Sequence, residues 1–255
     1  MAIKEFSDIS ANTAEHTKLT KEYVQWPQTQ KRYQAEAEYK RLDDIANQRA
    51  LQEKTILLRH SLVKEYMDAL GQLAADEAVT YDKEMDNLGK ATKEAKLVNA
   101  EEADVFSAVA KLLLKASTDA WRQDKLKDFV KTANPDIKVV IGGLKQIMDQ
   151  GFIGDLDDED IAVQKYYRAI VLESKDKAGI AAINEWRDVK LDSITNRRKA
   201  IKAYSLALEK ISDAHEKLNN AINVNNITSK EFLGQMSRYA KDIQNAYNNI
   251  ISLQG

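Results

Sequence analysis

The sequence predicts an all-α protein, an elongated bundle of long antiparallel amphipathic helices with coiled-coil-like seams. Apolar side chains recur over long stretches at alternating spacings of three and four, as they do on one face of a packed helix. The 255 residues include only 9 Gly and 2 Pro, whereas β-sheet domains need frequent turn residues. Hydrophobic residues make up 44% of the chain, which is enough for a packed core.

The N-terminal part predicts a short helix followed by a long one. The short helix carries Phe6, Ile9, His16 and Tyr23, and Pro27 is well placed in the first turn of the next helix. That second helix is expected to run from residue 28 to about residue 75. About 45 residues at a rise of 1.5 Å span nearly 70 Å, so we expect a rod. Its apolar residues at heptad-compatible positions are Leu42, Ile45, Ile56, Val63, Tyr66, Leu70 and Leu73.

The middle of the chain is less regular. Residues 80–97 predict a weak helix, with Met85 and Leu88 as the sizeable apolar residues at its centre. Asn99 then begins a better helix, with Glu102 at the capping-box position. This helix is expected to extend toward Leu126 and Phe129, and its buried residues are Phe106, Val109, Leu113, Ala116 and Ala120.

Three signals predict helix boundaries between residues 134 and 179. Asn134-Pro135-Asp136 combines a cap, a first-turn proline and an early acid, which together mark a new helix start. Four glycines (Gly142, Gly143, Gly151 and Gly154) indicate the main interhelix turn at residues 150–157. The acids of residues 155–160 then fall at the N-terminus of the following helix, where the helix dipole favours negative charge. Residues 175–179 are expected to interrupt that helix.

The clearest helical signal lies late in the chain. One seam consists of Ile194, Arg197, Ile201, Tyr204, Leu208, Ile211, His215, Leu218 and Ile222, and the last helix repeats the pattern with Phe232, Met236, Tyr239, Ile243, Ala246, Ile250 and Leu253. The asparagine-rich residues 219–226 separate the two helices, because asparagine side chains compete with helical hydrogen bonds. Thr228 and Glu231 form a capping box that restarts the helix. We therefore predict an antiparallel hairpin.

The whole chain, residues 1–255, is expected to form a single elongated helical-bundle domain. Within it, the long-helix body would comprise residues 28–75 and 158–255, and the shorter helices would occupy residues 80–154. The chain contains no internal repeat and no segment that requires a linker between two domains.

Charge and composition exclude several classes of protein. Lys+Arg 38 and Asp+Glu 40 nearly cancel to a formal net charge of -2, so we expect no nucleic-acid partner. The absence of cysteine excludes disulfides and thiolate metal sites. No stretch approaches the ~18 apolar residues of a membrane-spanning helix. The first six residues lack the basic-then-apolar pattern of a signal peptide. They fit either a native start or a start codon placed before a mature exported domain.

No catalytic, metal or cofactor site is recognisable. The residues three positions before His16, His60 and His215 are not glutamate, which excludes the di-iron bundle pattern. His215 lies in the helical seam itself, so a core histidine bonded to a neighbour is favoured over a metal ligand. A calcium loop starting at Asp155 would need glycine and glutamate where Asp160 and Tyr166 stand.

The glycine pair and the three tryptophans are also better explained by a structural role than by a binding site. The glycine pair at residues 142–143 lacks the partners and the preceding strand of a phosphate-binding loop. The residues Trp26, Trp121 and Trp186 are expected to be anchors in the core or at helix junctions.

Three stretches carry a resemblance to known proteins. They are Tyr66–Ala74 (YMDALGQLA), Ala133–Leu144 (ANPDIKVVIGGL) and Ala203–Leu218 (AYSLALEKISDAHEKL). Together they resemble a loose group of uncharacterised, entirely helical envelope proteins of Gram-negative bacteria, often made as lipoproteins. The resemblance implies a periplasmic or envelope setting for a mature domain, with membrane association through a lipid anchor that this chain lacks. A cytoplasmic setting is expected otherwise.

These observations predict a non-enzymatic helical interaction or scaffold protein of the bacterial envelope, with a protein partner. One alternative is a membrane-active helical protein, either a BAR-like curvature module or a helical pore-forming toxin. Another is a four-helix ligand-sensing domain. The candidate interaction surface, unless this segment only closes one end of the bundle, consists of Ile137, Val140, Leu144, Ile147, Phe152 and Ile153. An apolar stripe can pack within one chain or against a second copy, so the sequence leaves the oligomeric state open.

Overall fold

The computed structural model describes residues 2–80 and 100–254, and every regular element in these ranges is helical. This confirms the predicted all-α class. The α-helices are α1 (Ala2–Ala14), α2 (Lys18–Gln30), α3 (Tyr39–Ala74), α5 (Ala100–Thr118), α6 (Leu126–Gln146), α7 (Ile153–Glu173), α8 (Lys177–Asn223) and α9 (Lys230–Gln254). Short 3₁₀ turns are η1 (Lys31–Tyr33), η2 (Glu36–Glu38) and η3 (Gln123–Lys125), and the π-helical η4 (Ile147–Phe152) joins α6 to α7.

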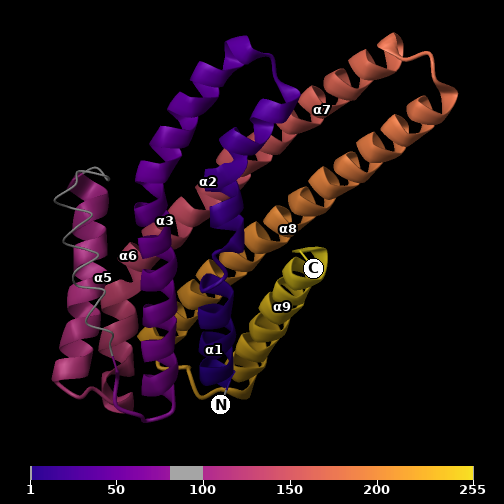
Figure 1. The fold of residues 1–255 in the computed structure, drawn as a ribbon. Coiled ribbons are helices and arrows are strands. Elements are labelled where there is room, and N and C mark those ends of the chain that lie inside the picture. The colour runs from indigo at the N-terminus through magenta and orange to yellow at the C-terminus, as the bar shows by residue number, and fades with distance from the viewer. Residues whose placement is uncertain (1, 81–99, 255) are drawn as a thin grey trace.

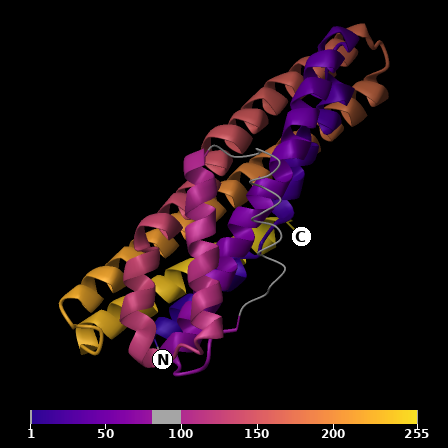
Figure 2. The ribbon, with the colours of Figure 1, turned by 90° about the vertical axis from the view of Figure 1, so that its left-hand side faces the viewer.

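The helices form an elongated bundle of segments that run in two opposite directions (Figure 1, Figure 2). α3, α5 and α8 run antiparallel to the α1–α2, α6–α7 and α9 segments. The N-terminus lies at the end of the bundle where α8 turns into α9. At the opposite end, α7 and α8 continue as a two-helix hairpin that projects from the bundle.

One continuous hydrophobic core joins η4 and every α-helix within the described residues. The predicted α8 seam is confirmed: from Ile194 to Ile222 every member is buried except Arg197. On α9, Phe232, Met236, Ile243 and Ile250 are buried against it, which confirms the antiparallel hairpin. Burying one such aliphatic or aromatic side chain contributes about 1.5–3 kcal/mol, so these seams hold the long helices together.

The expected start of the long helix at Pro27 is wrong. Pro27 lies inside α2, and its side chain is buried there. α2 continues past the proline and ends at Gln30. The chain then turns through η1 and η2, and α3 begins at Tyr39 and ends at Ala74, close to the predicted end.

The expected helix start at Asn134 and the expected turn at residues 150–157 are also wrong. Residues 126–173 are helical throughout as α6, η4 and α7. The limit at residue 154 of the segment of shorter helices therefore falls inside a continuous helical segment. None of the described glycines has a positive φ. A Cβ on Gly143 would lie 2.1 Å from Arg59 Nη1, and one on Gly151 would lie 3.2 Å from Tyr23 Cε2. These glycines therefore permit close packing, which the sequence pattern does not distinguish from a turn.

Two other boundaries differ in detail, and a third is as predicted. α5 ends at Thr118, and Ala120 takes a left-handed conformation with φ 49°, so Ala120 is exposed and Phe129 belongs to α6. α9 is capped by Ser229 Oγ, which accepts from the backbone N–H of Phe232, one residue later than predicted. The predicted break after α7 is confirmed, since Asp176 caps α8. The expectations for Met85, Leu88 and the cap at residue 99 lie outside the described residues.

Candidate interaction surface

The candidate surface predicted from sequence lies inside the bundle. The side chains of Ile137, Val140, Leu144 and Phe152 are fully buried, and Ile147 and Ile153 are partly buried against the same core. The reason is the uninterrupted α6–η4–α7 helix, which packs this apolar stripe against α3 and α8. The expectation that these six residues present an exposed apolar surface is therefore wrong.

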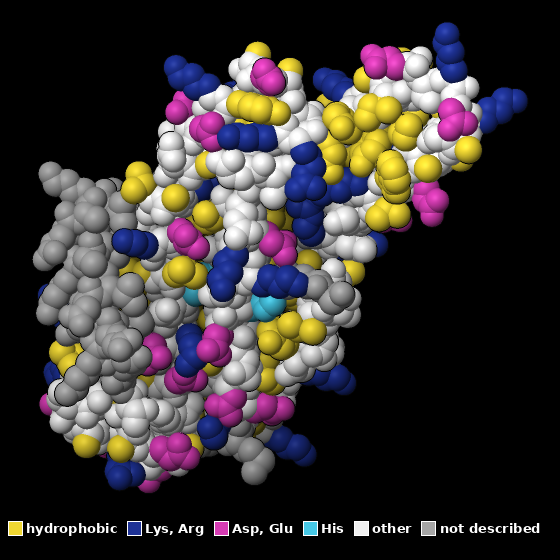
Figure 3. Space-filling model, in the orientation of Figure 1, with side chains coloured by type: hydrophobic (Ala, Val, Ile, Leu, Met, Phe, Trp, Pro, Cys, Tyr) yellow, Lys and Arg dark blue, Asp and Glu magenta, His cyan; other side chains and the backbone are white. Residues whose placement is uncertain are grey.

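Exposed apolar side chains gather instead on the α7–α8 hairpin. We call residues 161–193 the distal arm. Among the described residues, half of the large hydrophobic side chains that are exposed belong to it, namely Ile161, Tyr166, Leu172, Trp186 and Val189. Figure 3 shows hydrophobic side chains clustered over the distal halves of α7 and α8. The other five are spread over α3, α6, α8 and α9 and the turn after α8.

The arm is exposed because only two helices build it. Val163 is the last buried residue of α7, and Ile194 is the first buried residue of α8. Between them no residue is fully buried, although Tyr167, Ile170 and Ile183 are half-buried. A helix pair that other elements cover only in part leaves much of its apolar surface in water, which favours docking of a further element.

One face of the arm is aromatic. The ring of Tyr33, from η1, lies 5.5 Å from that of Tyr166 and 6.3 Å from that of Tyr167. Burial raises the pKa of the Tyr33 hydroxyl, so this side chain stays neutral. On α8, Trp186 is 62% exposed and Val189, less than one turn later, is 64% exposed. The expectation that Trp186 is a core anchor is therefore wrong, whereas Trp26 is buried as predicted.

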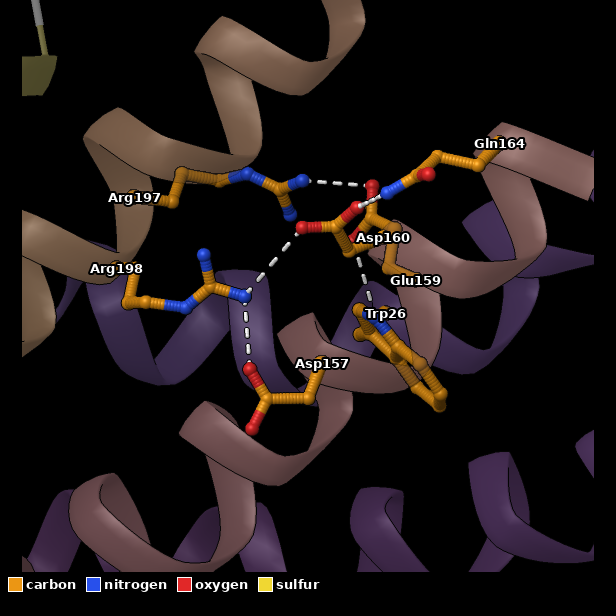
Figure 4. Close-up of polar contacts among 7 residues, drawn as sticks. All are labelled: Trp26, Asp157, Glu159, Asp160, Gln164, Arg197 and Arg198. Carbon is orange, nitrogen blue, oxygen red and sulfur yellow. Dashed lines mark hydrogen bonds and ion pairs between the residues drawn. The ribbon is translucent and has the colours of Figure 1, made fainter.

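A buried ion-pair cluster fixes the root of the arm (Figure 4). Glu159 of α7 is 1% exposed and accepts hydrogen bonds from Trp26 Nε1 at 3.1 Å and Arg197 Nη2 at 2.6 Å. Lys190 Nζ lies 2.9 Å from the same carboxylate. Burial alone would raise the pKa of Glu159, but the two neighbouring cations outweigh it and lower the pKa. The Glu159 carboxylate is thus buried between two partly exposed cations, and the cluster joins α2, α7 and α8.

The neighbouring acids of α7 are paired in the same way. Arg198 Nη2 donates to Asp157 at 2.7 Å and lies 3.8 Å from Asp160. Arg49 Nη2 donates to Asp155 Oδ1 at 2.7 Å, and its Nη1 lies 2.7 Å from Oδ2 while donating to the Tyr23 carbonyl. Burial raises the pKa of Asp155, opposed by Arg49. The predicted helix-dipole role of these acids is wrong, because α7 continues from η4 and has no exposed N-terminus.

The two buried histidines are hydrogen-bonded within the core. His215 Nδ1–H donates to Asn134 Oδ1 at 3.1 Å, and its Nε2 accepts from Tyr66 Oη at 2.6 Å. His60 Nδ1–H donates to the Ala14 carbonyl at 2.7 Å, and its Nε2 accepts from Thr20 at 2.8 Å. Burial lowers the pKa of each histidine to about 4. The prediction of a core histidine in the α8 seam is thus confirmed.

The third histidine lines an open pocket where α1 turns into α2. The pocket has a volume of about 550 Å³, and its polar lining includes Asn12, Glu15, His16, Lys18 and Lys21, together with Gln244 and Tyr247 of α9. The His16 and Tyr247 rings meet edge to face at 6.1 Å. Sequence reasoning missed this convergence because it joins the two ends of the chain. Within the described ranges, no three histidine or carboxylate side chains are placed to share a metal ion.

No family model, curated protein or solved structure matches the chain. In the described ranges, no helix combines the length and the low charge needed to cross a membrane.

Proposed function

We propose that this protein is a non-enzymatic helical interaction protein that presents its distal arm to a partner protein. The observation that carries the proposal is the concentration of exposed apolar side chains on a two-helix hairpin beyond Val163. A concentration of exposed apolar side chains on one element of a folded protein favours docking of a partner there. The ion pairs of Glu159 hold the arm in place, so it is presented to a partner as a rigid element.

Complex formation in extracts of the producing cells tests this proposal. The wild-type chain is expected to elute in a larger complex than the purified chain. Trp186→Ala with Val189→Ser removes the exposed apolar groups of α8 and should shift the protein to the elution volume of the purified chain. Leu51→Ser with Val224→Ser is the matched control, because these residues are similarly exposed but lie outside the arm. Retention of the complex by the arm variant would refute the proposal.

An envelope setting for this protein remains part of the proposal. It is supported by the resemblance of the three stretches of sequence to helical envelope proteins. Fractionation of the producing cells, with detection of the full-length protein, tests it. Recovery in the cytosolic fraction alone would contradict the envelope setting and would leave the role of the arm unaffected.

A second candidate function is sensing of a small anionic ligand by the pocket beside His16. Lys18 and Lys21 bring two cations to a pocket whose one acid is Glu15, and Gln244 adds a neutral hydrogen-bonding group. Thermal unfolding with added phosphate, acetate or citrate tests it. A rise in Tm that Lys21→Ala abolishes would support the candidate, and an unchanged Tm with all three anions would remove it.

A further inference from the structure

A groove runs along the face of the distal arm that lies opposite Trp186. It has a volume of about 590 Å³ and lies between α7 and α8. Ile161, Val171 and Leu191 supply its apolar lining, and Ile161 is 53% exposed. With 100° of rotation per helical residue, Trp186 points nearly opposite to Asp188, which lines the groove. The groove and the aromatic face are thus separate surfaces of one arm.

The rim of the groove is basic. Lys165, Arg168 and Arg187 line it, against one acid, Asp188. Arg187 is paired with Asp188 at 3.0 Å, whereas Lys165 and Arg168 form no ion pair with any described residue. The rim is therefore positive although the chain as a whole carries a formal net charge of -2. Two unpaired cations beside an apolar groove are complementary to acidic groups on an incoming partner.

The positions along α7 match the pattern of a helix-binding surface. Ile161, Lys165, Arg168 and Leu172 are spaced by four, three and four residues, so they lie on one face. Leu172, at the distal end, is 76% exposed. A third helix packed against this face would cover Ile161 and Leu172 and place its own flanking residues beside the two cations.

We propose that this groove binds an amphipathic helix of a partner protein, with an apolar stripe flanked by acidic residues. The inference rests on the proposed interaction role and names the chemistry of the partner. A groove between two helices is concave and accepts a helix of about 10 Å diameter better than it accepts a flat bilayer. Helix α5 of a second copy, which carries acids in its first turn, is a poor occupant, because its apolar residues Phe106, Val109 and Leu113 are buried in its own core.

Peptide binding to the full-length protein tests the groove. The probe is a fluorescein-labelled 20-residue helical peptide with leucines at spacings of three and four and glutamates flanking them. The comparison peptide has lysine in place of every glutamate. We expect the glutamate peptide to bind at least about tenfold more tightly, measured by fluorescence anisotropy.

Variants on the two faces separate this inference from the proposed function. Lys165→Glu with Arg168→Glu should reverse the preference between the peptides, and Trp186→Ala should leave it unchanged. Both changes are at exposed residues, so the fold is retained, which circular dichroism verifies. Absent binding, equal binding of both peptides, or no effect of the charge reversal would overturn the groove assignment. Stronger association with vesicles containing phosphatidylserine than with the glutamate peptide would also overturn it. None of these results tests the proposed function, which the variant Trp186→Ala with Val189→Ser tests separately.

Discussion

Tyr66 and His215 are 149 residues apart in sequence and form a hydrogen bond of 2.6 Å in the core. Tyr66 Oη donates to His215 Nε2, and the Tyr66 ring stacks on Phe129 with centroids 4.9 Å apart. His215 in turn donates to Asn134, so one polar chain links α3, α8 and α6. Tyr66 and His215 are buried, Asn134 is half-buried, and each of the three is bonded, which fixes the register of three long helices.

Removing the Tyr66 hydroxyl should destabilise the protein. Tyr66→Phe leaves the Nε2 acceptor of His215 buried without its donor, which costs about 1–3 kcal/mol. Urea denaturation of the purified chain measures the change. Tyr166→Phe is the control, because Tyr166 is exposed and a surface change of this kind alters stability by less than about 0.5 kcal/mol. Equal stability of the two variants would contradict the assigned hydrogen bond.

Stability should fall as the pH falls from about 6.5 toward 4. Folding lowers the pKa of His60 and His215 to about 4, so below pH 6.5 the unfolded chain binds protons that the folded chain does not. The stability that the two neutral histidines contribute is fully present above pH 6.5. It is lost progressively as the pH falls to 4, by at most about 3 kcal/mol for each histidine.

Denaturation midpoints at pH 7 and 4.5, with NMR titration of the imidazoles, check this prediction. The resonances of His60 and His215 should show no titration above pH 5. A titration midpoint near pH 6.5 for either imidazole in the folded protein would show that this ring is not buried in the core.

The two adjacent glycines of α6 should respond oppositely to alanine. Gly143→Ala places a Cβ against the buried Arg59 guanidinium, which must move away from its partner Glu102, at a cost of about 1–3 kcal/mol. Gly142→Ala meets nothing within 4 Å and should raise stability by up to about 1 kcal/mol, since alanine favours the helix. Thermal unfolding of both variants measures this contrast. Destabilisation by both to the same extent would argue for a turn at this position.

Breaking the cluster at the root of the arm should loosen the arm. Glu159→Gln leaves Arg197 and Lys190 without their shared carboxylate, and we expect a loss of about 2 kcal/mol, because both cations are partly solvated. Spin labels at the tip of the arm and on α3 should show a broader distance distribution. Asp157→Asn is the control, because Asp157 is 61% exposed and its ion pair contributes little. An unchanged distribution in Glu159→Gln would exclude the positioning role.

The long seams were predictable because they depend on local periodicity alone. The α8 and α9 stripes follow the 3.6-residue period over many turns, and the structure buries nearly all of their members. His215 could be placed in the core for the same reason. The fold class and the α8–α9 hairpin therefore follow from the residues themselves.

The continuous α6–α7 segment and the arm depend on tertiary contacts that periodicity does not report. Gly143 and Gly151 look like turn residues until Arg59 and Tyr23 are found against them. The acid Glu159 looks like a helix cap until its partners on α2 and α8 are known. One feature of the sequence does indicate the arm. The regular apolar seam of α8 begins only at Ile194, and the apolar residues before Ile194 fall on several sides of the helix, so they form no single buried stripe.

Site-specific photo-crosslinking in the producing cells would decide whether the arm is a docking surface. A photoreactive amino acid replaces Trp186 in one variant and the similarly exposed Leu51 of α3 in the other. We predict one discrete protein adduct from position 186, identified by mass spectrometry, and none from position 51. The same adducts from both positions, or no protein adduct from position 186, would contradict the proposed role of the arm.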